Sequence, residues 1–253
     1  MAQVIPSLSE TISRFGAGCV GIALTLAVAG CAKAPISDAV NDPAEGFNRK
    51  VFAFNVAVDK AVLQPVSDVA GSGRGPILTG VHNFAANLDT PGDIVNNVLQ
   101  GRLMKAAANT LRFGVNTTAG IGGLFDPSTA LGLPAQETDF GETLYVWGVG
   151  EGSYEMLPIL GPSTQRDTVG LVVDYAMNPL RFAIKSPESD YVTGAKVIDK
   201  IGSRARHSDT VDSILYDSAD PYAQARLLYL QNRHYTLGGN SATDENFEDP
   251  YAQ

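Results

Sequence analysis

Cys31 stands in a sequence context that favours covalent attachment of lipid. It follows Leu26-Ala27-Val28-Ala29-Gly30, so small residues stand directly before the cysteine and a branched apolar residue stands three places before it. This arrangement is typical of a lipobox, in which the preceding segment is removed and the thiol carries acyl chains. We therefore predict that residues 1–30 are a lipoprotein signal peptide and that Cys31 is the lipidated first residue of the mature chain.

The uncharged run at residues 15–30 has two other interpretations, a transmembrane helix and a buried core helix. It contains four glycines and is shorter than the roughly 20 apolar residues that a membrane span needs, so a signal-peptide core fits better. Cys19 is a poorer lipidation site because Gly16 occupies the position where a branched apolar residue is expected.

The side chains needed for catalysis do not form a recognisable set. The mature chain holds three histidines, His82, His207 and His234, each in a polar helical stretch, and it has no Gly-x-Ser-x-Gly elbow. His207 and Asp209 alone are too few for a metal site. We therefore expect no enzyme activity, no metal and no cofactor.

The mature chain would have 223 residues, enough for one substantial domain or two small ones. Cys31 is its only cysteine, so no intramolecular disulfide can form. Its net charge stays at −9, because residues 1–30 contain one Arg and one Glu. This charge argues against nucleic acid as a partner, and membrane contact would have to be acyl and apolar rather than electrostatic.

Apolar residues at helical spacing predict an all-α body behind a polar leader at residues 31–41. The first helix should run from Pro43 to about Leu63, capped by Asn41 or Asp42 and ended by Gln64-Pro65. It is apolar on more than one face, which indicates either full burial or contact with acyl chains. Further helices are expected over 77–88, 94–99, 102–118, 165–177, 190–217 with a break near residue 207, and 221–235.

Two stretches rich in glycine interrupt these helices. Residues 120–123 end the helix over 102–118, whose apolar face should pack against a neighbour. Residues 148–162 hold several glycines and prolines and are expected to be irregular. The best strand candidate, residues 144–149, is equally the tail of a short helix over 138–147. The acidic segment 238–253 is predicted to be a disordered tail.

Several ordered segments resemble the MlaA (VacJ) family of outer-membrane lipoproteins, and together they span most of residues 42–237. They are Asp42-Pro43-x-Glu45-Gly46-Phe47-Asn48-Arg49-x-x-Phe52-x-Phe54-Asn55, Arg112-Phe113-x-x-Asn116-Thr117-x-x-Gly120-x-Gly122-Gly123, Phe140-Gly141-x-Thr143-Leu144, Gly148-Val149-Gly150-x-Gly152-x-Tyr154-x-x-Leu157-Pro158-x-x-Gly161-x-Ser163-x-x-Arg166-Asp167, and Ser218-x-Asp220-Pro221-Tyr222 with Arg226 and Tyr229.

The resemblance implies a single ring-shaped helical domain with a central channel, lipid-anchored at the periplasmic face of the outer membrane beside a porin trimer. Such a protein would take phospholipid mislaid in the outer leaflet and pass it to a soluble periplasmic carrier for retrograde transport, which maintains lipid asymmetry. The residues that the resemblance offers as channel or motif candidates are Phe47, Asn48, Phe54, Asn55, Arg112, Asn116, Gly120, Gly122, Gly123, Gly148, Gly150, Gly152, Arg166 and Asp167.

Two roles remain open for the charged candidates. Arg112, Arg166 and Asp167 either face a channel, where a guanidinium would meet a lipid phosphate, or pair with other side chains inside the protein. The glycines either make ordinary turns or leave a segment mobile enough to gate.

Two alternatives to lipid transfer also remain. One is a structural lipoprotein that braces porins or the envelope without transferring lipid. The other is a lipid hydrolase, which the missing nucleophile set disfavours.

Overall fold

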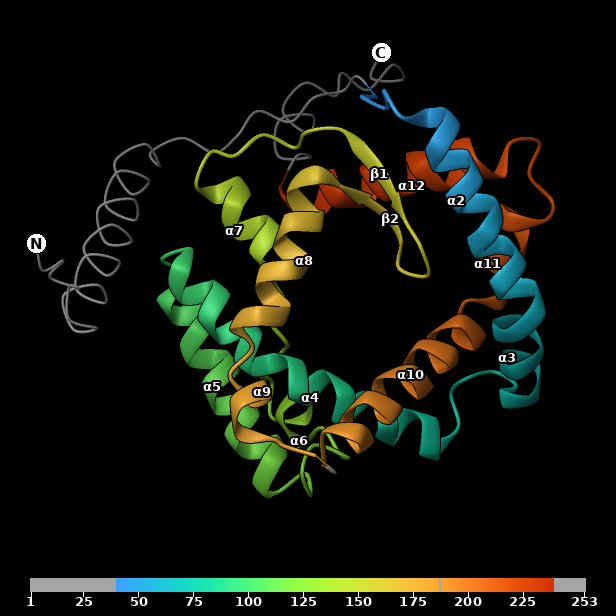
Figure 1. The fold of residues 1–253 in the computed structure, drawn as a ribbon. Helices are drawn as coiled ribbons and strands as arrows, with labels where there is room; N and C mark the ends of the chain where they lie inside the picture. The colour runs from blue at the N-terminus through green and yellow to red at the C-terminus, as the bar shows by residue number, and fades with distance from the viewer. Residues whose placement is uncertain (1–39, 187, 239–253) are drawn as a thin grey trace, which may run out of the picture.

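The computed structural model describes residues 40–186 and 188–238. Cys31, the predicted signal peptide and the tail from residue 239 lie outside the described residues. Figure 1 shows the helices arranged as a ring around a central gap, with the first and last described elements next to each other. The expected helical class is confirmed, since two short strands are the only β-structure in the described part.

One side of the ring is a long, nearly continuous helical stretch. It comprises α2 (Glu45–Val58), the π-helical turn η1 (Asp59–Leu63) and α3 (Gln64–Ala70). The predicted stop at Gln64-Pro65 is wrong, because Pro65 falls in the first turn of α3, where its missing N–H costs no hydrogen bond. The predicted cap is also wrong: α2 begins after Ala44, without a side-chain cap.

The opposite part of the ring contains α4 (Pro76–Leu99) and α5 (Leu103–Thr118). We predicted two helices in place of α4, separated at Asp89-Thr90-Pro91, but α4 runs through Pro91 as one helix. The Thr90 hydroxyl donates to the Ala86 carbonyl one turn back, and the helix packs on both α5 and α10 (Glu188–Arg206). This packing outweighs the local preference of proline for a helix end.

The helices predicted over 165–177, 190–217 and 221–235 are present, whereas the short helix at residues 180–183 was not predicted. Residues 138–147 contain a helix rather than a strand, α7 (Phe140–Val146), and the Thr164 side chain caps α8 by accepting from the Asp167 N–H. The predicted break near residue 207 separates α10 from α11, and Asp220 caps the final helix. These elements are α6 (Pro127–Ala130), α8 (Gln165–Met177), α9 (Leu180–Ala183), α11 (Ser208–Leu215) and α12 (Pro221–Thr236).

The stretch that we expected to be irregular forms an antiparallel hairpin. Strand β1 (Tyr154–Leu157) pairs with β2 (Gly161–Thr164), with Tyr154 opposite Thr164. Four-residue strands carry too little alternation to be recognised in a sequence, and this hairpin has no third strand. Side chains of α2 take the place of that strand, as described below.

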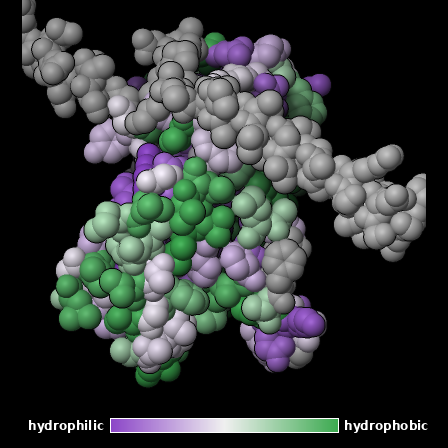
Figure 2. All heavy atoms as spheres, turned by 90° about the vertical axis from the view of Figure 1, so that its left-hand side faces the viewer, coloured by the Kyte–Doolittle hydropathy of each residue, from purple (hydrophilic) through white to green (hydrophobic). Residues whose placement is uncertain are grey.

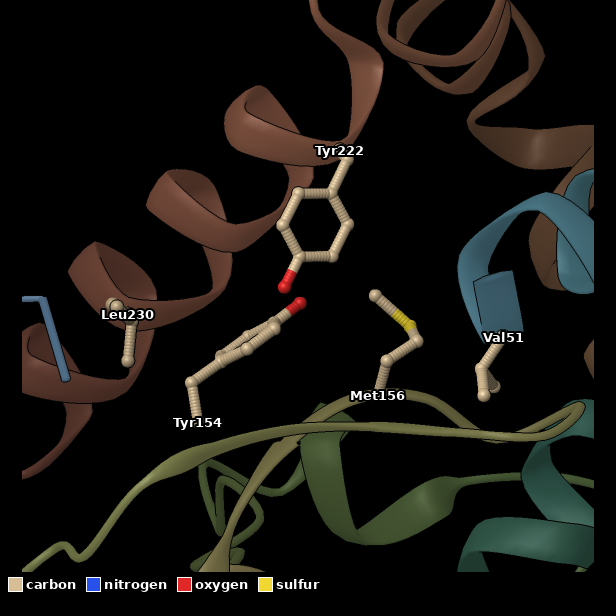
Figure 3. Packing of buried hydrophobic residues seen from close by; sticks show 5 residues of the cluster. All are labelled: Val51, Tyr154, Met156, Tyr222 and Leu230. Atoms are coloured by element: carbon tan, nitrogen blue, oxygen red, sulfur yellow. The ribbon is translucent and has the colours of Figure 1, made fainter. Parts of the chain in front are cut away.

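The main apolar cluster joins the hairpin to α2 and α12. It contains Val51, Tyr154, Met156, Tyr222 and Leu230, all buried (Figure 3). The rings of Tyr154 and Tyr222 meet edge to face, with centroids 6.0 Å apart. The cluster therefore lies where the beginning of the described chain meets its end.

Candidate functional site

Salt bridges close the ring between α2 and α12. Arg226 Nη1 lies 2.6 Å from Asp42 Oδ2, and the Tyr222 hydroxyl also donates to Asp42. Burial alone would raise the pKa of Asp42, but hydrogen bonds from Tyr222 and Arg226 hold it below its ordinary value. A bidentate pair from Arg49 to Asp220, with contacts of 3.0 and 2.8 Å, adds a second link between the two helices.

A second, partly buried cluster joins α12 to α7 and α8. The Arg233 guanidinium donates to both carboxyl oxygens of Asp139 and of Asp167, each at 2.7 to 2.9 Å. The Tyr229 hydroxyl donates to Asp167 at 2.7 Å. Burial favours the neutral form of Asp167, yet Arg233 keeps its pKa below the ordinary value. Asp167, a channel candidate, therefore pairs inside the protein.

Arg166 lies beside this cluster with fewer partners. It is 4% exposed, its Nε is 3.5 Å from Asp167 Oδ1, and its guanidinium lies over the Tyr145 ring at 5.4 Å. Its Nε and Nη2 atoms are buried without a hydrogen-bond partner. Among the candidates from sequence, Arg166 is thus the cation with unused hydrogen-bonding capacity.

The polar face of α5 holds the loop that follows it. Arg112 donates to Asp126 at 3.0 Å, to Thr129 and to the Leu133 carbonyl. Asn116 donates to Asp126 at 3.0 Å and accepts from the Ser128 N–H at 3.1 Å. Although burial opposes it, hydrogen bonds from the Thr129 hydroxyl and N–H, followed by those from Arg112 and Asn116, lower the pKa of Asp126 to about 2. Arg112 and Asn116 are both buried and fully engaged in this loop.

Two asparagines of α2 bind the hairpin. Asn48 and Asn55 lie seven residues apart on one side of the helix and contact β1 and the turn that follows it. Phe47 and Phe54, also candidates, are 66% and 50% exposed. The helix therefore uses these amides for internal bonds and leaves the rings of Phe47 and Phe54 at the surface.

The candidate glycines lie in two connections. Gly120 and Gly123 are packed closely in the turn after α5, where a Cβ atom would lie 2.4 Å from the Asn116 carbonyl oxygen and 2.6 Å from Asn87 Cβ, respectively. Gly152 has a φ of +78° beside Gln165, whereas a Cβ on Gly150 would meet nothing within 4 Å. Gly122 and Gly148 also have positive φ, in the turn after α5 and after α7. All six belong to turns or extended connections rather than to helices.

The surface of α5 is inverted relative to a helix of an ordinary soluble protein. Its apolar residues Leu103, Met104 and Leu111 are 65%, 83% and 59% exposed, while Asn109 and Arg112 are buried. The apolar face that we expected to pack against a neighbour is therefore at the surface. Figure 2 shows the side on which α5 lies, and apolar residues cover much of its middle and lower part.

The same inversion affects α8 and the described residues as a whole. The α8 face that contacts α7 holds Arg166 and Asp167, whereas Val169, Val172 and Tyr175 on other sides are more than half exposed. Among residues 40–186 and 188–238, buried polar residues outnumber buried hydrophobic ones. Exposed apolar patches of this extent mark surfaces that contact lipid or another protein.

Two of the histidines are paired with carboxylates elsewhere in the protein. His82 Nδ1 lies 2.9 Å from Asp199, and His234 Nε2 lies 3.2 Å from Glu151. In the described part of the chain, no group of three or more His, Cys, Asp or Glu residues could hold a metal ion. Nor is any described helix both long enough and apolar enough to cross a membrane.

The sequence analysis did not identify Arg233 as an ion-pairing residue. It also did not identify the polar face of α12 on which Arg233 lies. The spacing of Tyr222, Arg226, Tyr229 and Arg233 is four, three and four residues, which places all four on one face of α12. A face of arginines and tyrosines at this spacing predicts a set of internal ion pairs and hydrogen bonds. The pairing of Arg204 with Asp59, at 3.0 Å between α10 and η1, had no comparable signal.

Comparison with known proteins gives a consistent set of matches. The family model described as MlaA lipoprotein matches residues 40–236. An uncharacterised protein of Rickettsia felis is 39% identical over 189 residues, 74% of each chain. The intermembrane phospholipid transport system lipoprotein MlaA of Escherichia coli strain K12 is 35% identical over 219 residues, 84% of each chain.

A solved structure agrees with these sequence matches. It comes from work on the structural basis for maintenance of bacterial outer membrane lipid asymmetry, and its chain is 36% identical to this one. The match has a TM-score of 0.66 and covers 78% of this chain and 98% of the other. With a family model and relatives above 30% identity along most of its length, this chain belongs to the MlaA lipoprotein family.

Proposed function

We propose that this protein is an outer-membrane lipoprotein that removes mislocalised phospholipid from the outer leaflet and so maintains lipid asymmetry. The observation that carries the proposal is the inversion of α5 and α8, which bury Arg and Asn or Asp side chains and expose Leu, Met and Val. A helical body satisfies its own backbone hydrogen bonds and can therefore sit in a lipid leaflet. The relatives in Escherichia coli and Shigella flexneri carry the name of an intermembrane phospholipid transport system lipoprotein.

The route that we propose passes through the centre of the ring. Lipid would enter a channel there and leave to a soluble periplasmic carrier, with no bond broken. The ring would be anchored by acyl chains on Cys31 at the periplasmic face and held beside a porin trimer.

Deleting the gene tests the proposal directly. Phospholipid accessible to an external phospholipase on intact cells should rise, and the wild-type gene should restore the parental level. An unchanged outer leaflet would overturn the proposal. A purified protein that binds porin but never delivers labelled phospholipid to the carrier would instead support a structural lipoprotein.

A second experiment separates the anchor from the body. Cys31→Ala should give a folded protein that no longer fractionates with the outer membrane. Each missing acyl chain removes about 0.8 kcal/mol of membrane-binding free energy for every CH₂ group that it would bury. Unaltered fractionation of the variant would show that Cys31 is not the anchor or that the body anchors itself.

A further inference from the structure

The turn of the β1–β2 hairpin is apolar and exposed although the base of the hairpin is buried. Tyr154 and Met156 at the base are each 2% exposed, whereas Ile159 and Leu160 in the turn are 67% and 63% exposed. The segment Leu157-Pro158-Ile159-Leu160-Gly161-Pro162 contains no side chain that can donate or accept a hydrogen bond. The hairpin is thus anchored by its core end and presents hydrocarbon at the other.

The backbone of this turn is held in an unfavourable conformation. Ile159 has a φ of +67°, in the left-handed region that β-branched residues avoid. Such strain persists only where surrounding contacts enforce it. Here the contact is Asn55 of α2, which accepts from the Ile159 N–H at 2.7 Å and donates to the Leu157 carbonyl at 2.9 Å.

Asn48 repeats the same contact seven residues earlier on α2. It accepts from the Met156 N–H at 3.1 Å and donates to the Tyr154 carbonyl at 3.2 Å. Two asparagines thus replace a neighbouring strand and fix the hairpin along α2. Asn48 binds the buried base of the hairpin, and Asn55 binds the exposed turn.

The position of the turn indicates what it contacts. α2 forms part of the ring, and Figure 1 shows the β1–β2 turn reaching into the gap that the helices surround. Protein interfaces depend on Tyr, Trp and Arg anchors, none of which the turn contains. A purely aliphatic tip, on a turn that reaches into the gap of the ring, matches a hydrocarbon chain instead.

We propose that Ile159 and Leu160 form a fixed contact for a phospholipid acyl chain, and that Asn55 is the positioning residue that holds the turn on which they lie. This inference rests on the proposed lipid transfer and names the part of the lipid that the turn recognises. Asn55 touches no lipid; it acts through the backbone of the turn.

Photo-crosslinking in cells tests the contact. A photoreactive amino acid replaces Leu160 in the full-length protein, and adducts are identified by mass spectrometry after irradiation. We expect phospholipid adducts on an acyl chain. Asn55→Ala should lower their yield about fivefold, as expected when two hydrogen bonds that hold the turn are lost. Asn55→Asp, which keeps an acceptor for the Ile159 N–H, should give an intermediate yield.

Asn83→Ala is the matched control, because Asn83 also donates from a helix to a backbone carbonyl, that of Leu124 at 3.2 Å. It should leave the Leu160 adduct unchanged. Melting temperatures of all variants show whether a lower yield reflects unfolding, and a yield that falls only in step with melting temperature would overturn the positioning role.

The outcomes separate this inference from the proposed function. A protein that transfers phospholipid to the carrier but gives no lipid adduct at Leu160, or only protein adducts there, would overturn the inference alone. A wild-type protein that transfers no phospholipid would overturn the proposed function as well.

Discussion

Asparagine side chains act as substitute backbone in this protein. Besides Asn48 and Asn55, Asn109 donates to the Gln136 carbonyl at 2.9 Å and accepts from the Gln136 N–H at 3.1 Å. An amide offers a carbonyl and an N–H at the spacing of a peptide group, so it can satisfy a strand or loop that has no neighbouring strand. This device lets a small hairpin and a long loop remain ordered against helices.

Asp93 on α4 is the carboxyl whose charge should limit stability near neutral pH. Burial and the neighbouring carboxylates of Asp89, Glu137 and Asp174 raise its pKa to about 7, against a hydrogen bond from the Thr138 N–H. An unfolded chain releases this proton near pH 4. The folded state therefore binds more protons between about pH 4 and 7, and the free energy of unfolding falls as the pH rises through that range.

Asp93→Asn should accordingly raise the melting temperature at pH 8 and change it little at pH 4. The substitution removes the charge and keeps an acceptor for Thr138. Thermal unfolding at both pH values measures the effect, and Asp68→Asn at an exposed position is the control. An equal shift of the Asp93→Asn variant at both pH values would contradict the assignment.

At the scale of elements, α7 and α8 approach too closely for side chains. A Cβ atom on Gly170 would lie 2.5 Å from Gly141 N and 2.8 Å from Gly141 Cα. Both are backbone atoms, which cannot rotate away. The two glycines let the helices meet where Asp167 must reach Arg233.

Gly170→Ala should therefore destabilise the protein by about 1–3 kcal/mol through overpacking. Gly194→Ala in α10 is the matched control, because a Cβ there meets nothing within 4 Å. That change should stabilise by up to about 1 kcal/mol, the gain in helix propensity. Denaturant unfolding of both variants measures the difference, and equal effects at the two sites would refute the close-contact explanation.

Elements that follow from local rules were predictable from the sequence. The helices predicted over 221–235 and 165–177 lie close to the bounds of α12 and α8, because caps such as Asp220 and Thr164 and the first-turn Pro221 act within a few residues. Pro65 and Pro91 were misread for a related reason. Their consequence depends on the π-turn before Pro65 and on the neighbours of α4, which local sequence does not report.

The inverted orientation of α5 was equally beyond a local prediction. Its apolar stripe was visible at Leu103, Ala107 and Leu111, but periodicity identifies a face without saying what covers it. The polar stripe at Asn109, Arg112 and Asn116 held the decisive information, since its partners lie in the following loop.

At the scale of the whole molecule, the exposed apolar side chains of α5 and α8 give a surface suited to an apolar environment. In a Cys31→Ala background, replacing Leu103, Met104 and Leu111 by Gln should weaken binding to phospholipid vesicles by at least about tenfold. Each apolar side chain contributes about 1.5–3 kcal/mol when it leaves water. Sedimentation with vesicles measures the binding.

The same three substitutions should leave the melting temperature nearly unchanged, because these side chains are exposed. Lys105→Gln with Thr118→Gln, at exposed polar positions of the same helix, is the control. Vesicle binding that survives the triple substitution would place the membrane contact elsewhere on the ring.

The structure shows which of the candidate residues from the sequence make bonds inside the protein. Arg112, Asn116 and Asp167 are engaged in internal bonds. These motif residues therefore stabilise the ring. Residue type alone cannot distinguish a motif residue with this structural role from one that contacts the transported lipid. That distinction requires burial and partners, which depend on the assembled fold.

The closure of the ring also determines how a pull on the beginning of the chain would be borne. The Asn41 carbonyl accepts from the Tyr154 N–H at 2.7 Å, and the next residue, Asp42, is bound to α12 through Arg226. Tension arriving from the upstream leader is thus shared between the hairpin and the last helix before it reaches the first turn of α2. A protein tethered by this end would therefore pass a pull on its anchor to the hairpin and to α12 before its first helix is loaded.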